Sequence, residues 1–507
     1  QLLATRFVLR LKSNYKEMKK IMYLGIASVL ISSCEYGEDS EWAQYENYSG
    51  NEIEANNESY NLNGETVIEN SFVNVSDEPI STFGLDPDGA SYAKAKNLIN
   101  SNTLPNGESV RIEEFINYFN FDYPEPAGLP VHVEGEIAKC PWNGEHKLLR
   151  IGLQGKDYKG FYPNSNYVFL IDVSGSMNGQ MDLVKESLYL LIDQLGENDA
   201  VSIVTYAGDE RVVCEGVSGS EKSILKSYAN NLNSGGSTNG EAGITKAYDL
   251  AKKNFKVKGN NRVVLVTDGD FNVGVSNRDE LKKLIKDKAK TGVYLSALGV
   301  NAYTDGQVNM QNLALHGNGT YDFIGSNEDA EKVFVEDYNK FFAVAKDVKI
   351  QVHFDPSRVK SYRLIGYENR LMSNEDFDND SIDSGDLNSS QSVTAVYELE
   401  MQGTIGKAVE LKFKYKNLGS DVSQDLKVSV YDQNVDFQSA SENFRFACGI
   451  TGFGLMVKDS QYKGDLTLED VKNMVGGALN YDPNGNRNEL LKLIDKYSDL
   501  KNSLSGN

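Results

Sequence analysis

The stretch Tyr167-Val-Phe-Leu-Ile-Asp-Val-Ser-Gly-Ser-Met177 decides the fold of this 507-residue chain. Its continuous apolar run is typical of a strand that is buried on both faces, as in a parallel sheet. Asp172, Ser174 and Ser176 follow at every second position, at the carboxyl end of the strand, where open α/β sheets bind their ligands. Three hard oxygen ligands at this place predict a divalent cation site, with Mg²⁺ expected and Ca²⁺ or Mn²⁺ as alternatives. The competing interpretation is a strand end capped by polar side chains, without a metal.

Strand-like and helix-like segments alternate regularly from residue 165 to residue 345. In the segment 181–195 the apolar residues recur at helical intervals, so one face of that helix is expected to pack on the sheet. This alternation predicts a mostly parallel, doubly wound, Rossmann-like sheet. The expected strands are 167–172, 201–206, 262–267, 293–300 and 320–324, and the expected helices are 181–195, 221–231, 241–255, 278–290, 309–316 and 328–345.

Two further stretches are expected to reach the same edge of the sheet. Ser234-Gly-Gly-Ser-Thr-Asn-Gly240 is a glycine-rich loop that leads into a helix, and Thr267-Asp-Gly-Asp270 ends a strand. We therefore expect Thr238 and Asp268 as the fourth and fifth metal ligands. A cation that is incompletely ligated at the surface predicts capture of an acidic group from another molecule.

Outside the α/β segment the apolar period changes to two, as in half-buried antiparallel strands. The strands expected at 131–137 and 148–153 lack enough partners of their own, and five more are expected after Lys346. We therefore expect one β-sandwich into which the α/β domain is inserted, with two separate β domains as the alternative. The predicted regions are an N-terminal region of helices and sandwich strands (71–164), the α/β domain (165–345), the rest of the sandwich (346–435) and a helical region (436–507).

The first 33 residues are expected to be a processing segment and not part of the fold. Met18-Lys-Lys20 and the apolar run after it form a signal peptide, preceded by an upstream extension. Leu30-Ile-Ser-Ser-Cys34 resembles a bacterial lipobox, which implies lipidation of Cys34. Residues 34–70 are polar and acidic without apolar periodicity, so we expect a disordered tether. The predicted location is the bacterial cell envelope, lipid-anchored to a membrane, with the outer membrane expected, on its periplasmic or surface side.

The formal net charge of the chain is −22, from 51 Lys+Arg and 73 Asp+Glu. Such a chain repels nucleic-acid phosphates and anionic lipid headgroups, so we expect no nucleic-acid partner and a membrane attachment that depends on the lipid. The four cysteines lie far apart and form no Cys-x-x-Cys pair, which argues against a zinc site and a dense disulfide framework. We expect no disulfide.

The run Asp172-Val-Ser-Gly-Ser176, with Thr238 and Asp268, resembles the metal-ion-dependent adhesion site of von Willebrand factor type A (VWA) domains. The resemblance implies direct coordination by the two serines and the threonine, while the aspartates often act through water. A Glu or Asp of a protein partner would take the sixth position. Further motifs look like those of a bacterial lipoprotein family with its own N-terminal region before a VWA domain and a C-terminal domain of undefined function: Arg111-Ile-Glu-Glu-Phe-Ile-Asn-Tyr-Phe119, Cys140-Pro-Trp-Asn143 and Tyr362-Arg-Leu-Ile-Gly-Tyr-Glu-Asn-Arg370.

These features favour a membrane-anchored lipoprotein that binds a protein partner through the metal site, in adhesion or envelope assembly. A structural envelope scaffold, in which the metal only stabilises loops, is the alternative, and a metal-dependent hydrolase is a third hypothesis. We expect no enzymatic activity, because Ser174 and Ser176 have no evident base. None of the histidines lies in the site segments: His132, His146, His316 and His353.

Two other groups of residues invite a site interpretation. Cys140, Trp142 and His146 lie close together in the sequence, but no second cluster of ligands accompanies them, so core packing is favoured. The acidic segment from Glu375 to Asp386 matches the start of a calcium loop but lacks Gly at the sixth position and Glu at the twelfth. A solvated acidic loop is therefore the favoured interpretation.

Overall fold

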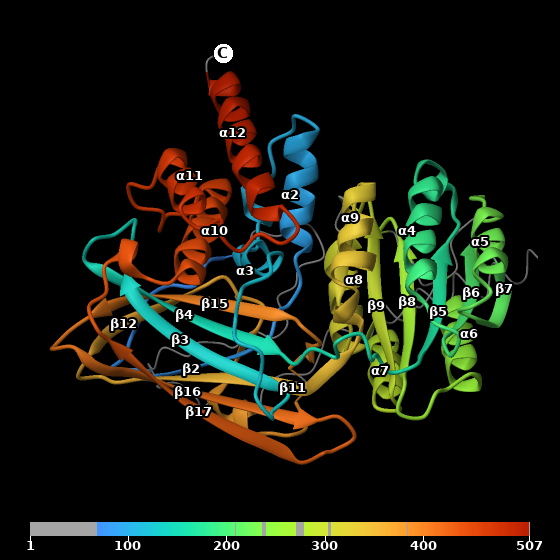
Figure 1. The fold of residues 1–507 in the computed structure, drawn as a ribbon, viewed down its shortest axis with the longest axis horizontal. Helices are drawn as coiled ribbons and strands as arrows, with labels where there is room; N and C mark the ends of the chain where they lie inside the picture. Colours follow the sequence, from blue (N-terminus) through green and yellow to red (C-terminus); the bar gives the residue numbers. More distant parts are fainter. Residues whose placement is uncertain are drawn as a thin grey trace, which may run out of the picture. The chain divides into compact units, whose positions relative to one another are not determined.

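The computed structural model describes residues 68–207, 209–235, 240–269, 278–302, 306–382 and 384–505, all within one compact unit that spans Asn56–Asn507. Figure 1 shows two antiparallel sheets that form a sandwich and a mostly parallel sheet with helices on both faces. We call residues 165–342 the α/β unit. The predicted fold class is confirmed: a doubly wound α/β sheet is inserted in a β-sandwich, and helices follow at the C-terminal end.

The sheet of the α/β unit has six strands, of which only one runs antiparallel. All residues of its central strand, β5, are buried, because this strand has neighbours on both edges and helices over both faces. The antiparallel strand β7 lies at one edge. The spatial order is β10 (Tyr321–Ile324), β9 (Val293–Val300), β8 (Asn260–Thr267), β5 (Ser165–Asp172), β6 (Ala200–Ala207) and β7 (Asp209–Ser218).

Alternate side chains of β5 enter two different cores, as expected for a strand that is buried on both faces. Tyr167, Phe169 and Ile171 belong to one apolar cluster, whereas Val168 and Leu170 belong to another. The neighbouring strands and the helices over each face supply further residues of both clusters (Figure 1). The first face is covered by α4 (Met181–Gln194), α5 (Lys222–Asn230) and α9 (Asn327–Glu331), and the second by α6 (Gly240–Lys253), α7 (Arg278–Ala289) and α8 (Gly306–His316).

The sandwich encloses one apolar core between its two antiparallel sheets. Val348, Ile350 and Val352 show the period-two pattern, since all three point from one strand into this core. One sheet has the order β1 (Val73–Asn74), β12 (Val359–Ile365), β15 (Ser392–Met401), β4 (His146–Gly155) and β3 (Val131–Lys139). The other has the order β13 (Leu371–Met372), β2 (Ile80–Gly84), β11 (Ala343–Phe354), β16 (Gly406–Asn417) and β17 (Ser423–Asp432), with β14 (Leu387–Asn388) beside β11.

Each sheet of the sandwich takes strands from both sides of the α/β unit. β4 precedes the unit and pairs with β15, which follows it, and β2 pairs in the same way with β11. The chain leaves the sandwich after Gly155 and returns to it at Ala343. The hydroxyl of Tyr158 donates to the backbone oxygen of Ala343 across 3.1 Å, so the outgoing and returning segments lie side by side.

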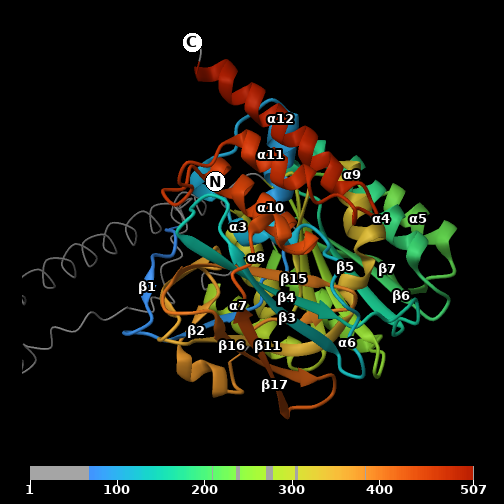
Figure 2. The same cartoon turned by 60° about the vertical axis from the view of Figure 1, so that its left-hand side comes forward.

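Helices that are distant in the sequence extend the apolar core on the second face of the α/β sheet, and both views show them packed together (Figures 1 and 2). The guanidinium of Arg487 lies 3.9 Å from the ring centroid of Phe446 and donates to the backbone oxygen of Asn120, so it joins three segments of this cluster. The helices are α2 (Ala90–Asn100), α3 (Ile112–Asn117), α10 (Glu442–Lys458), α11 (Leu468–Gly476) and α12 (Asn486–Ser505). Short helical turns lie at Gly107–Ser109, Gly175–Gly179, Lys332–Glu336, Tyr338–Phe341, Asn374–Asp378 and Phe437–Ser439.

The predicted helix 328–345 is helical over most of its length but is not one regular α-helix, and its end is wrong. The α-helix ends at Glu331, a π-helical turn at Lys332–Glu336 and a 3-10 turn at Tyr338–Phe341 follow, and Ala343 already begins β11. Pairing of Ala345 with Asn417 in the sandwich outweighs the helical spacing of the apolar residues before it. Strands β2 and β7 are additional to the predicted set, and both are short or peripheral elements with mixed polar and apolar sequence.

No helix in the described part of the chain combines the length and the apolar character needed to cross a bilayer. Cys140, Cys214 and Cys448 are buried free thiols. The predicted signal segment 1–33, Cys34 and nearly all of the predicted tether 34–70 lie outside the described residues.

Candidate metal centre

Asp172 is the last residue of β5, and its carboxylate is buried at the carboxyl edge of the sheet. The backbone N–H of Ser174 donates to Oδ1 across 2.8 Å, because the chain turns sharply where β5 ends. The hydroxyls of Tyr206 and Thr267 donate to Oδ2 across 3.2 and 3.1 Å. These two residues lie at the ends of β6 and β8, the neighbours of β5, so the sheet itself positions the carboxylate.

The turn after Asp172 brings two serine hydroxyls together. The Oγ atoms of Ser174 and Ser176 lie 3.0 Å apart. The backbone oxygen of Ser174 accepts a hydrogen bond from the N–H of Met177 across 3.2 Å, and the side chain of Met177 is buried in the core below. Ser176 is exposed, so the hydroxyl pair lies at the rim of the sheet edge. The structure therefore brings Asp172, Ser174 and Ser176 to one place, as predicted from their spacing.

The glycine-rich loop reaches the same edge with its described part. The N–H of Gly235 donates to the backbone oxygen of Val173 across 2.7 Å, and the hydroxyl of Ser234 donates to Oδ1 of Asn178 across 3.2 Å. The expected fourth ligand, Thr238, lies outside the described residues. The start of the loop is thus held directly against the turn that carries the serines.

Asp268 follows β8 and has an orphaned carboxylate oxygen. Parallel pairing sets Val266 of β8 opposite Ile171 of β5, so Asp268 and Asp172 lie at the same edge of the sheet. Oδ1 of Asp268 is buried and has no hydrogen-bond partner among the described residues. A buried carboxylate oxygen without a partner is unfavourable. A cation, or a water bound to one, would satisfy it.

The surroundings of Asp172, among them the carboxylate of Asp268, also shift the pKa of Asp172. Burial raises the pKa of Asp172 above its ordinary value, and the carboxylate of Asp268 adds to this effect. Hydrogen bonds from Ser174 and Thr267 oppose it. A dication would favour the charged form of both carboxylates.

The donor set fits Mg²⁺, because it consists of carboxylate and hydroxyl oxygens without sulfur or imidazole. Both oxygens of Asp172 already accept hydrogen bonds from protein groups, which suits contact with a metal through water. The hydroxyls of Ser174 and Ser176 and the orphaned oxygen of Asp268 are the described groups that would hold the ion.

The sequence alone does not single out Tyr206 and Thr267 as the residues that hold Asp172. A buried tyrosine at a strand end carries no signal of its own. Thr267 does carry one, since it directly precedes Asp268 at the end of a strand expected beside β5. Parallel pairing of the two strands places its hydroxyl next to Asp172.

The cluster of Cys140, Trp142 and His146 has the contacts of a packed core. Nδ1 of His146 lies 2.6 Å from Oε1 of Glu398, whose other carboxylate oxygen lies 3.0 Å from the guanidinium of Arg363. Cys140 and Trp142 are buried, and burial raises the pKa of the Cys140 thiol, which makes it a poor nucleophile.

Lysines hold the acidic segment from Glu375 to Asp386. Nζ of Lys349 donates to the backbone oxygen of Asp376 across 2.8 Å, and Nζ of Lys414 lies 2.6 Å from Oδ1 of Asp378. Ammonium groups of the protein thus take the contacts that a calcium loop would offer to its ion.

Comparison with known proteins places this geometry in a family. The model of the von Willebrand factor type A domain matches residues 166–337, and a model described as von Willebrand factor matches residues 54–150. A model described as "Uncharacterized protein YfbK, C-terminal" matches residues 339–410 and 405–500. A VWA domain suggests a role in adhesion or protein interaction.

One relative matches over most of this chain, and others match over a shorter part of it. "Uncharacterized protein YfbK" of Escherichia coli strain K12 is 36% identical over 450 residues, which cover 83% of this chain and 78% of that protein. Inter-alpha-trypsin inhibitor heavy chain H4 of Sus scrofa is 28% identical over 131 residues, which cover 24% of this chain and 14% of that protein. The solved von Willebrand factor type A protein from Catenulispora acidiphila is 16% identical, covers 74% of this chain and 91% of that chain, and has a TM-score of 0.42. The chain therefore belongs to the YfbK family of proteins with a von Willebrand factor type A domain.

Proposed function

We propose that this protein captures an acidic side chain of a protein partner through Mg²⁺ at the edge of its VWA sheet. The residues that would hold the ion are Asp172, Ser174, Ser176, Thr238 and Asp268. The observation that carries the proposal is the buried carboxylate of Asp172, held by three protein donors beside the hydroxyl pair of Ser174 and Ser176. The ion would offer one coordination position to a Glu or Asp of the partner.

The residues around the ion have separate tasks in this proposal. Tyr206 and Thr267 fix the position of Asp172, so its negative charge stays at the sheet edge when no partner is bound. Ser176 is exposed and leaves the outer side of the site open to a partner. The two carboxylates formally balance the charge of Mg²⁺, so a partner's carboxylate is attracted by the open coordination position of the ion and not by a net positive charge of the site.

Metal binding and partner binding are measured separately. Titration of the purified chain with Mg²⁺, followed by calorimetry, is expected to show one site, which the substitution Asp172→Ala removes. The matched control is Asp249→Ala, since Asp249 is an exposed aspartate on α6.

Affinity capture from envelope extract is expected to retain a partner with Mg²⁺ and to lose it in EDTA and with Asp172→Ala. Equal capture by wild type, with or without Mg²⁺, and by the variant would contradict the proposal.

A structural scaffold is the second candidate, and the satisfied hydrogen bonds of Asp172 favour it, because they order the turn by protein contacts alone. In that case chelation lowers the melting temperature while partner capture survives.

We also propose that the protein binds and does not catalyse. The described histidines have partners or surroundings away from the site, such as Glu398 for His146 and Gln351 for His353.

We infer from the sequence that a lipid on Cys34 holds the protein in the cell envelope, on the outer membrane, through the segment 34–70. The test is labelling with a radioactive fatty acid in a bacterial host, with Cys34→Ala as the comparison. Label on the wild type and none on the variant is expected. Equal labelling of both chains, or of neither, would contradict the inference.

A further inference from the structure

A cavity of about 90 Å³ lies where the loop before α2, strand β10 with the turns after it, and the turn between β14 and β15 meet. A cavity needs at least about 10 to 15 Å³ to hold one water, so this cavity has room for several water molecules. Most of the residues that line it are charged or polar, although about half of the lining surface is apolar. The charged residues of the lining include Asp88, Asp322, Asp329, Lys332, Asp337 and Lys340.

Most of these charges already have a partner within the protein. Nζ of Lys340 lies 2.5 Å from Oδ1 of Asp322, and Nζ of Lys332 lies 3.0 Å from Oδ2 of Asp337. Asp329 is paired with Lys96 of helix α2 across 3.1 Å. The two lysines in the lining are therefore neutralised and offer little to an anionic ligand.

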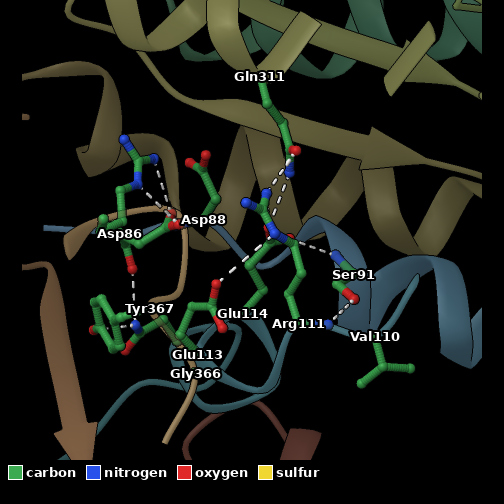
Figure 3. A network of polar contacts seen from close by, with 12 residues as sticks. Asp86, Asp88, Ser91, Val110, Arg111, Glu113, Glu114, Gln311, Gly366 and Tyr367 are labelled. Atoms are coloured by element: carbon green, nitrogen blue, oxygen red, sulfur yellow. Dashed lines mark hydrogen bonds and ion pairs between the residues drawn. The ribbon is translucent and has the colours of Figure 1, made fainter. Parts of the chain in front are cut away.

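Asp88 differs from the other acids of the lining. Its side chain is buried, with 7% of the residue exposed, and Oδ1 accepts a hydrogen bond from the N–H of Tyr321 across 3.3 Å. Among the described residues no lysine, arginine or histidine forms an ion pair with it. The adjacent Asp86, which is labelled with Asp88 in Figure 3, binds the guanidinium of Arg370 across 3.0 and 3.2 Å.

The groups around Asp88 affect the protonation of its carboxyl group in the free protein. Burial raises the pKa of Asp88 well above its ordinary value, and the carboxylates of Asp86, Glu114 and Asp322 add to this effect, while Arg370 opposes it. Lys332 and Lys340 face the same cavity but are paired with other acids. These groups favour the protonated form of Asp88, and a cation beside it would oppose them.

We propose that this cavity binds a small primary amine, whose ammonium group pairs with the carboxylate of Asp88. A buried carboxylate gains most from a charged hydrogen-bond donor in the same low-dielectric space. An ammonium group has three N–H donors, and the polar residues Thr320, Asn117 and Ser392 are also among those that line the cavity. The amine takes the place of the proton on Asp88.

This site is separate from the metal centre, because none of its residues belongs to β5, β8 or the turn after Asp172. An experiment that disproves amine binding therefore does not affect the proposed metal function. An experiment that disproves the metal function likewise does not affect the proposed amine binding.

The test uses ethanolamine as the amine and ethylene glycol, of the same size but uncharged, as the matched ligand. Calorimetry on the whole purified chain is expected to show saturable binding of ethanolamine and none of ethylene glycol. The substitution Asp88→Asn is expected to weaken ethanolamine at least about tenfold, since a buried charge-assisted contact is lost. The control is Asp122→Asn, an exposed aspartate outside the cavity, which is expected to bind like wild type.

A second measurement needs no variant and decides the matter if Asp88→Asn does not fold. Ethanolamine binding to the wild type at neutral pH, measured in buffers of different ionisation enthalpy, is expected to release close to one proton. Absence of saturable binding, equal binding of ethylene glycol, undiminished binding by Asp88→Asn, or binding without proton release would each overturn the proposal and leave a cavity that holds water only.

Discussion

The Nζ atom of Lys96 lies 3.1 Å from Oδ1 of Asp329, and both side chains are buried, at 5% and 2% exposure. Asn97 donates to the other oxygen of Asp329 across 2.6 Å. Lys96 and Asn97 belong to α2, whereas Asp329 belongs to α9, the last α-helix of the α/β unit. A buried ion pair thus joins the inserted unit to the helices that pack on the sandwich.

Removal of one partner of this pair is expected to destabilise the protein strongly. Lys96→Met leaves the carboxylate of Asp329 buried without its cation, which typically costs about 3–5 kcal/mol of unfolding free energy. The measurement is urea unfolding, with Lys492→Met as the control, because Lys492 is exposed on α12. A loss no larger than that of the control would contradict the buried pair, and Lys96→Met combined with Asp329→Leu is expected to recover part of the stability.

Thr267→Val is expected to weaken Mg²⁺ binding by about 10–100-fold, the usual effect of losing a group that orients a metal ligand. The reason is that Oδ2 of Asp172 loses one of its two hydroxyl donors. Thr451→Val is the matched control, since the hydroxyl of Thr451 is buried without a hydrogen-bond partner in the described structure. Calorimetric titration with Mg²⁺ measures both. Equal affinity of the two variants would show that Thr267 does not orient Asp172.

The stability of the protein is expected to fall as the pH rises towards neutrality, because of Glu113. Its side chain is fully buried and neither carboxylate oxygen accepts a hydrogen bond from a described residue, although Nε of Arg111 lies 3.8 Å away. Burial, and then the nearby Glu368, raise the pKa of Glu113 to about 7, while Arg111 lowers it.

The stability falls as the pH rises because the folded state binds the proton of Glu113 more tightly than the unfolded state does. The contribution is fully present below the ordinary glutamate pKa and is lost as the pH rises through about 7, with at most about 3 kcal/mol at stake. Glu113→Gln is expected to flatten the stability profile between about pH 4.5 and 7. Glu108→Gln, an exposed control on the preceding turn, is expected to leave the slope as it is. A wild-type profile that rises across this range would contradict the buried neutral acid.

Lys349→Met is expected to destabilise the sandwich by about 2–3 kcal/mol, because charged hydrogen bonds to two backbone oxygens disappear. Those oxygens belong to Asp376 and Asn379, and Lys349 is itself buried in β11. Lys427→Met on the exposed side of β17 serves as the control. Thermal unfolding measures the difference. If added Ca²⁺ restored the variant, the acidic segment would be a calcium site after all.

The sequence predicts the α/β sheet well because its strands are continuous apolar runs and its helices have apolar faces. The predicted strand 293–300 and the predicted helix 181–195 match β9 and α4. β7 is not predicted from apolar spacing, because an edge strand is half exposed and the pairing of β7 with β6 is irregular. The helical spacing before Ala343 misleads, because strand pairing in the sandwich decides the conformation there.

The candidate metal ligands can be predicted from the sequence because they follow buried strands that are expected to lie next to each other. Asp172 and Asp268 meet that condition, and the structure places both at one sheet edge. The buried acids Asp88 and Glu113 carry no such signal. Their burial arises from contacts between elements far apart in the chain, such as the backbone N–H of Tyr321 with Asp88, which no local pattern specifies.

The split sandwich constrains the order in which the protein can fold during synthesis. When β4 leaves the ribosome, its partner β15 does not yet exist, and the whole α/β unit must be made first. The apolar residues of β2, β3 and β4 stay uncovered for that time, which exposes them to aggregation. The inserted unit has its own core of parallel strands and can form early, and its closely spaced ends then bring Ala343 to the waiting strands. A nascent chain stopped before β11 is therefore a natural client for chaperones.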